Sequence, residues 1–116
     1  MGEDEFTERV ASVRKRFAAK LINRIAEIDV GLQACAGESA GAALFTAHLE
    51  LLDLCGNGPT LGFVATAQAA RACEAMLRQP CRDKRGLNEA ELATLREEMV
   101  ALRVAAQNDL QSKIPG

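Results

Sequence analysis

Apolar residues recur every three or four positions along most of the chain, the spacing that places them on one side of an α-helix. The first series runs from Phe6 to Leu32 and consists of Phe6, Val10, Val13, Phe17, Leu21, Ile25, Ile28 and Leu32. It predicts helix throughout this segment, after a polar start at residues 1–5. Periodicity alone does not separate one long helix from two stacked helices. A break near Arg16 and Phe17 therefore stays open.

A second helix is predicted from the small residues 40–43 to Gly56. Its core-facing stripe has spacings of three, four and three residues and consists of Leu44, Ala47, Leu51 and Leu54. At ~100° per residue, Phe45, Leu49, Leu52 and Gly56 share a second face, roughly 150° from that stripe. Large apolar side chains on a face that should meet water, next to a glycine that leaves the backbone uncovered, indicate a docking surface. His48, the only histidine, lies at its edge.

The segment from Cys55 to Pro59 is typical of a helix end, because it combines glycine, asparagine and proline. Pro59 suits the first turn of a third helix, which we expect to begin near Thr60 and to run to about Gln79. Its inward residues would be Phe63, Ala67, Ala70, Cys73 and Leu77. Residues 80–86 then form a polar linker.

A fourth helix has its own start signal. Asn88 is followed three residues later by Glu91, the pattern of a capping box. The apolar stripe that follows consists of Leu92, Leu95, Met99, Leu102, Ala106 and Leu110.

Four amphipathic helices with short connections predict a single all-α domain over residues 1–116. The expected architecture is an antiparallel, up-down four-helix bundle with a short or continuous N-terminal helical extension. The composition agrees, because the chain is 48% hydrophobic yet has no Trp or Tyr, which suits a close-packed aliphatic core. Residues expected among the buried ones are Phe17, Ile25, Leu44, Ala47, Leu51, Leu54, Leu95 and Leu102.

Charge and hydropathy narrow the classes of partner. A formal net charge of −2 argues against nucleic acid, since phosphate binding needs clustered basic residues and the run from Arg14 to Arg16 is short. The chain has neither a signal-peptide pattern nor an apolar run long enough to cross a membrane. A cytoplasmic protein that binds no membrane is therefore expected.

The reactive residue types are few. Four cysteines, Cys35, Cys55, Cys73 and Cys81, stand too far apart for paired metal ligands and accompany a single histidine. We expect no metal and no cofactor, and we expect Cys35 and Cys73 to be small buried hydrophobic residues. An acyl-transfer triad or a di-metal site also lacks the necessary residues.

The order of these segments resembles the histidine-containing phosphotransfer (HPt) domains of two-component phosphorelays, over roughly Phe6 to Leu110. The second-helix signature of that family, H-x-L-(K/A)-G-x-x-x-x-(F/L)-G-F, is matched at Leu54, Gly56, Leu61, Gly62 and Phe63. The family's later A-x-x-L-E pattern appears as residues 70–74, ARACE. The resemblance implies a helical bundle that exchanges a phosphoryl group with a receiver domain.

The sequence departs from this family where the chemistry occurs. Leu52 occupies the position of the phosphorylated histidine, and Cys55 a position often held by lysine. An isobutyl group offers no nucleophilic nitrogen, so the chain is expected to be no phosphotransfer enzyme. His48, one turn before Leu52, is the alternative phosphoacceptor, although a boundary imidazole that only covers the bundle edge is the simpler interpretation.

The main interpretation is a phosphorelay protein that has lost its phosphoacceptor. It would bind a response-regulator receiver domain or a hybrid histidine kinase through one face of the second helix. The candidate partner-binding residues are Phe45, His48, Leu49, Leu52, Cys55, Gly56 and Pro59. An alternative is a structural bundle that forms a homodimer through the Phe45, Leu49 and Leu52 face.

Overall fold

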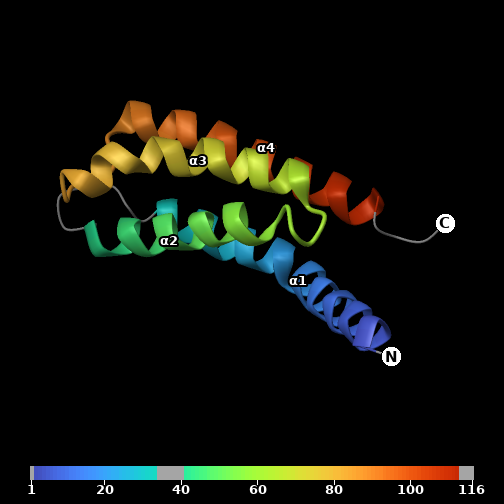
Figure 1. Ribbon diagram of the computed structural model, residues 1–116. Coiled ribbons are helices and arrows are strands. Elements are labelled where there is room, and N and C mark those ends of the chain that lie inside the picture. Colours follow the sequence, from blue (N-terminus) through green and yellow to red (C-terminus); the bar gives the residue numbers. More distant parts are fainter. Residues whose placement is uncertain (1, 34–40, 113–116) are drawn as a thin grey trace.

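The computed structural model describes residues 2–33 and 41–112, and it contains four helices. Figure 1 shows α1 (Gly2–Gln33), α2 (Gly41–Asn57), α3 (Val64–Arg82) and α4 (Glu89–Ser112). No β-strand occurs in the described ranges. The predicted all-α four-helix bundle is confirmed.

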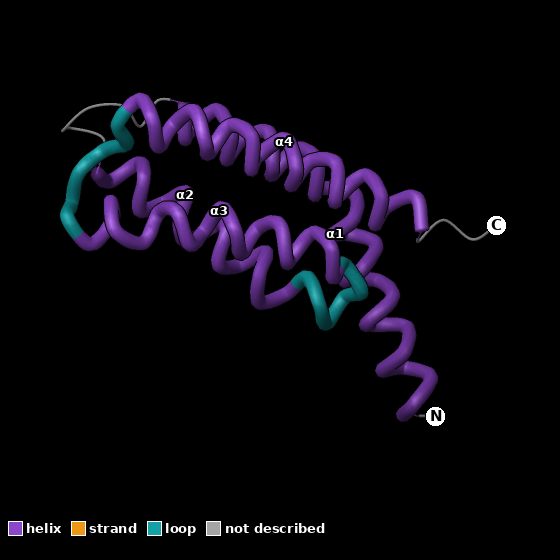
Figure 2. Tube along the Cα trace, turned by 90° about the horizontal axis from the view of Figure 1, so that it is seen from above, coloured by secondary structure: helices purple, strands orange, loops and turns teal. Residues whose placement is uncertain are grey.

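The helices pack in a ring. Helix α1 lies against α2 and α4, and α3 lies against the same two helices (Figure 2). The apolar stripes predicted from the sequence meet inside this ring. The largest fully buried side chains of the ring are Leu21, Ile25, Leu32, Leu44, Leu51, Leu54, Phe63, Leu77, Leu95 and Leu102.

Helix α1 is continuous, so the break that the sequence left open near Arg16 and Phe17 does not occur. Its N-terminal part, residues 2–16, projects beyond the other helices and is called the arm below (Figure 1). Phe17, where the arm meets the bundle, is only partly buried, whereas the sequence placed it in the core. Its ring lies 5.1 Å from that of Phe63, centroid to centroid.

Helix α3 begins at Val64, later than the predicted start near Thr60. Gly62 has a φ of 88°, which an α-helix does not accommodate. Residues 58–63 form a tight turn instead, in which the Phe63 N–H donates to the Gly58 carbonyl at 2.7 Å. A Cβ on Gly58 would lie 2.7 Å from the Leu54 carbonyl oxygen, so the turn needs glycine there.

The polar linker expected at residues 80–86 is shorter than predicted, because α3 continues through Pro80 to Arg82. Proline lacks the N–H that an interior helix position donates, but Pro80 stands in the last turn and its ring is fully buried. Lys84 then takes a left-handed φ of 54° and reverses the chain toward α4.

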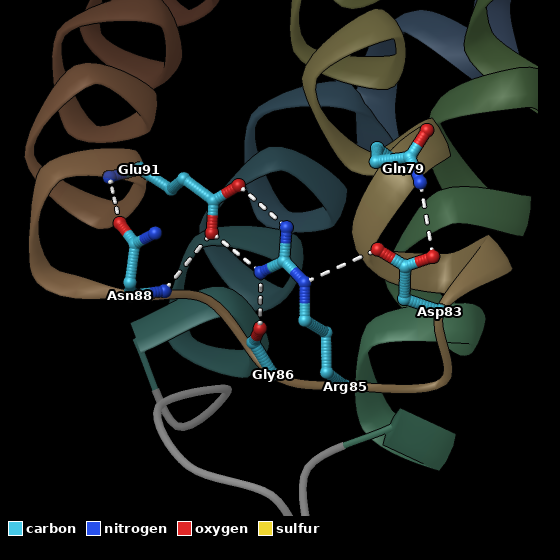
Figure 3. Close-up of polar contacts among 6 residues, drawn as sticks. All are labelled: Gln79, Asp83, Arg85, Gly86, Asn88 and Glu91. Carbon is cyan, nitrogen blue, oxygen red and sulfur yellow. Dashed lines mark hydrogen bonds and ion pairs between the residues drawn. The ribbon is translucent and has the colours of Figure 1, made fainter.

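The capping box of α4 is confirmed. The Glu91 N–H donates to Asn88 Oδ1 at 2.8 Å, and the Asn88 N–H donates to Glu91 Oε1 at 3.0 Å (Figure 3). Arg85 binds both oxygens of Glu91, at 2.7 and 3.0 Å, and also donates to the Gly86 carbonyl. This hydrogen bonding raises the pKa of Arg85 and lowers the pKa of Glu91, and it ties the loop to the helix start.

The first turn of α3 is capped from a distant helix. Phe63 precedes the helix and has no capping side chain, but the Thr66 N–H and hydroxyl both donate to Asp109 Oδ2 of α4, each at 2.8 Å. A carboxylate at a helix N-terminus also opposes the positive end of the helix dipole. Asp109 therefore fixes the start of α3 against α4.

Two cysteine predictions have different outcomes. Cys73 is buried as expected, and burial raises the pKa of its thiol to about 12. Cys35 lies outside the described residues. As for membranes, none of the described helices has both the length and the apolar character that a span would need.

Candidate partner-binding site

Helix α2 divides its apolar residues between two faces, as the sequence predicted. The predicted core stripe is buried throughout, with no member more than 5% exposed. On the other face, Phe45 is 54% exposed, Leu49 50% and Leu52 42%. We call Phe45, Leu49, Leu52 and Gly56 the outer face of α2. It presents large apolar side chains to solvent on a rigid helix.

The end of the outer face leaves backbone uncovered. Gly56 is exposed, and a Cβ built on it would meet nothing within 4 Å. The fold therefore does not require glycine at this position, in contrast to Gly58. Pro59, the second residue of the turn, is also exposed, and its carbonyl accepts a hydrogen bond from the Gly62 N–H at 3.1 Å.

His48 is turned away from the outer face and toward α3. Its side chain is 15% exposed, and Nε2 lies 2.9 Å from Glu74 Oε1. The same carboxylate accepts two hydrogen bonds from Arg78, at 2.8 and 2.7 Å. A polar cluster of one histidine, one glutamate and one arginine thus joins α2 to α3.

The charge state of Glu74 determines which ring nitrogen of His48 carries the proton. Although Glu74 is only 4% exposed, the Arg78 guanidinium, with help from His48, holds the pKa of its carboxyl below the usual value against the effect of burial. An ionised carboxylate only accepts hydrogen bonds, so Nε2 carries the proton and its N–H donates a hydrogen bond to Glu74. This nitrogen has no free lone pair while the contact persists. The geometry matches the boundary role considered for His48.

Cys55 also faces α3, where its thiol lies 3.8 Å from the Ala67 carbonyl oxygen. Burial, followed by the charge of Glu74, raises the pKa of this thiol, while Arg71 and Arg78 act in the opposite direction. Cys55 is therefore a neutral thiol at neutral pH. Arg71 places positive charge near this edge of α2, whereas Arg78 is paired with Glu74.

The opposite edge of α2 is acidic, and one arginine offsets part of its charge. Arg24 of α1 binds Glu50 at 2.9 Å and Asp53 at 2.8 Å. Burial disfavours the charge of Arg24, but the two carboxylates outweigh that effect and raise its pKa. The edge of α2 toward α3 therefore carries Arg71 and the Arg78–Glu74 pair, and the edge toward α1 carries Arg24 paired with Glu50 and Asp53.

The structure separates the seven candidate residues into two groups. Phe45, Leu49, Leu52, Gly56 and Pro59 are exposed along α2 and the following turn, whereas His48 and Cys55 lie at the contact with α3.

The sequence interpretation did not include Glu74 and Arg78 as partners of His48. Their spacing of four on one helix is a signal for a side-chain pair, but the contact with His48 depends on how α2 and α3 are aligned.

Among the described residues, no three His, Cys, Asp or Glu side chains gather closely enough to hold a metal ion. Comparison of the chain with protein-family models, with curated proteins and with solved structures gives no significant match.

Proposed function

We propose that this chain is a non-catalytic, HPt-like binding protein of a cytoplasmic two-component phosphorelay. The outer face of α2 would bind the receiver domain of a response regulator or of a hybrid histidine kinase. The observation that carries the proposal is the exposure of Leu52, Leu49 and Phe45 on a helix whose opposite stripe is fully packed.

Two further features support this partner class. The residues that resemble the HPt signature belong to α2 and the turn after it, and Leu52 stands exposed where that signature has its histidine. Arg71 lies close enough to Cys55 to act on its thiol and adds positive charge near this part of α2, whereas Arg78 is paired with Glu74. A receiver domain presents a phosphorylatable aspartate, and the positive charge of Arg71 would attract its acidic surroundings.

The test is a titration of the protein against candidate receiver domains, with and without a phosphoryl-mimicking ligand. Leu52→Arg should weaken binding at least tenfold, because it puts a charge in the centre of an apolar contact. Leu52 lies ~120° from the core stripe, so the new side chain reaches water in the free protein and stability should barely change. Val100→Arg, at an exposed apolar residue of α4, is the matched control and should leave binding unchanged.

Two results would overturn this reasoning. If Leu52→Arg unfolds the domain, the leucine belongs to the core and the outer face is no docking surface. If sedimentation shows a dimer that Leu52→Arg converts to monomer, while no receiver binds, the face joins two copies of this chain.

The absence of phosphotransfer is tested separately. Incubated with a phosphorylated receiver or kinase, the wild-type protein should take up no acid-labile, base-stable phosphoryl group, since Leu52 has no nucleophile. A label that disappears in His48→Ala would show that His48 leaves Glu74 and acts as phosphoacceptor.

A further inference from the structure

The arm carries a second apolar surface that the proposed function does not use. Phe6, Val10 and Val13 continue the stripe by which the rest of α1 packs into the bundle, yet Phe6 and Val13 are exposed. Figures 1 and 2 both show the arm projecting past the turn that follows α2. A helical segment of about 15 residues is marginal in water without tertiary packing, so an uncovered stripe along it calls for a partner.

A groove lies between the arm and that turn, with a volume of about 420 Å³. We call it the arm groove; its lining residues include Val10, Val13 and Phe17 of α1 and Thr60 and Leu61 of the turn. The floor is apolar, because these α1 side chains and Leu61 all contribute to it.

The two walls of the arm groove are fixed relative to each other. Arg14 Nε donates to the Leu61 carbonyl at 3.0 Å, which joins the arm to the turn directly. The rings of Phe17 and Phe63 pack at 5.1 Å just below. The groove is therefore largely formed before a ligand arrives, which reduces the entropic cost of binding.

One border of the groove is basic. Arg9, Arg16 and Lys20 are exposed and make no ion pair with another described side chain. Arg9 precedes Val13 by four residues and Arg16 follows it by three, so both flank Val13 on α1, and Lys20 continues the row one turn later. The acidic residue that lines the groove, Asp53, is already bound by Arg24.

We infer that the arm groove binds an acidic amphipathic helix of a partner protein. Apolar residues of that helix, spaced three and four apart, would pack on Val10, Val13 and Phe17 and extend the bundle by one helix. Its carboxylates would face the row of Arg9, Arg16 and Lys20. This is the helix-in-groove mode of recognition, with charge complementarity that sets the orientation.

The other occupants fit less well. Two arms paired antiparallel about a twofold axis would set their basic rows side by side, and like charges repel. A lipid surface is broad and flat, whereas the groove is bounded on two sides by the arm and the turn. The α2 outer face and the arm groove share no residue, so the two binding proposals can fail independently.

The test uses a fluorescent peptide of about 18 residues, five helical turns. The peptide carries leucines at helical spacing flanked by glutamates, and a second peptide replaces every glutamate by lysine. Fluorescence anisotropy with the full chain should show at least tenfold tighter binding of the acidic peptide. Added salt should weaken this binding, since the ion pairs lie at a solvent-exposed border.

Variants locate the site. Val13→Glu should weaken binding of the acidic peptide at least tenfold, and Val100→Glu on α4 is its matched control and should not. Arg16→Glu is a second arm variant at an exposed position, and it should narrow the difference between the two peptides. Circular dichroism establishes that each variant is folded.

Several outcomes would overturn the inference. Equal binding of both peptides would mean that the groove has no preference for acidic partners, and binding unaffected by Val13→Glu would place the site elsewhere. A dimer in sedimentation that Val13→Glu dissociates would make a second copy the occupant. Binding to anionic phosphatidylserine vesicles that Val13→Glu removes, with no binding of the acidic peptide, would make the arm a membrane contact.

Discussion

Removing the Asp109 carboxylate should destabilise the bundle, because Asp109 Oδ2 accepts two hydrogen bonds at the start of α3. Both donors belong to Thr66, which is fully buried, so neither reaches water easily once the acceptor is gone. An unsatisfied buried donor costs about 1–3 kcal/mol. Asp109 itself is only partly buried, and water can enter where it stood. We therefore expect Asp109→Ala to cost about 2 kcal/mol, at the upper end of helix-cap losses.

Related variants separate the contributions of the charge, the hydroxyl bond and the N–H bond to this loss of stability. Asp109→Asn keeps a neutral acceptor and should cost less, because it loses mainly the interaction of the charge with the helix dipole. Thr66→Val removes the hydroxyl donor but keeps the N–H bond, at about 1 kcal/mol. The double variant Asp109→Ala with Thr66→Val should cost about 1 kcal/mol less than the sum of the two, since both remove the same hydroxyl bond.

The assay is urea unfolding followed by circular dichroism, in which the midpoint shifts and the slope stays constant if the folded and unfolded states are otherwise unchanged. Asn108→Ala changes an exposed neighbour on the same helix and should alter stability by less than about 0.5 kcal/mol. If Asp109→Ala is no more harmful than Asn108→Ala, the carboxylate does not cap α3 and the reasoning fails.

Further predictions concern Glu74 of α3, Gly56 of α2 and Gly58 of the turn. Because the folded-state pKa of the Glu74 carboxyl is lowered, its contribution to stability is present above its unfolded-state pKa and disappears as pH falls through the folded-state value. Acid titration of unfolding should therefore destabilise wild type more than Glu74→Gln; equal losses would mean that Glu74 is not stabilised as an anion. Gly56→Ala should stabilise the protein by about 0.5–1 kcal/mol, since its Cβ meets open space. Gly58→Ala should destabilise it in thermal unfolding, because its Cβ would approach the Leu54 carbonyl; the opposite order would refute the packing of the turn.

Local signals explain the parts of the fold that the sequence predicted well. The buried stripe of α2 and its exposed Leu52 follow from the rotation of ~100° per residue, which operates within one helix. Asn88 and Glu91 of the capping box are three positions apart, so this signal is also contained within one helix start.

The errors arise where tertiary packing overrides local preference. Pro80 reads as a helix end in the sequence, but burial of its ring in the last turn of α3 allows the helix to continue. Phe17 has the spacing of a core residue, yet it stands where the other helices end and the arm begins. The position of a bundle's end is a property of all its helices, and one stripe does not determine it.

The candidate site shows the same division. Exposure of Phe45 and Leu49 could be predicted from helix geometry, whereas the partner of His48 could not, because Glu74 lies 26 residues further along the chain. The cap on Thr66 comes from 43 residues away. Such contacts depend on how far neighbouring helices are shifted along their axes relative to each other. Short loops restrict this shift but do not specify it.

The turn at residues 58–63 links the two proposed binding surfaces. Gly58 packs closely on the end of α2, the Leu61 carbonyl holds Arg14 of the arm, and Phe63 packs on Phe17. A change in the turn would therefore alter the direction of the arm and the end of the outer face together. The net charge of −2 conceals the row of Arg9, Arg16 and Lys20 beside the arm groove, although Glu5 and Glu8 lie on the arm and Asp53 lines the groove. The class of partner depends on where charged residues lie on the fold. Here the basic row lies next to the apolar floor of the arm groove, and this combination suits an amphipathic protein helix better than a phosphate backbone.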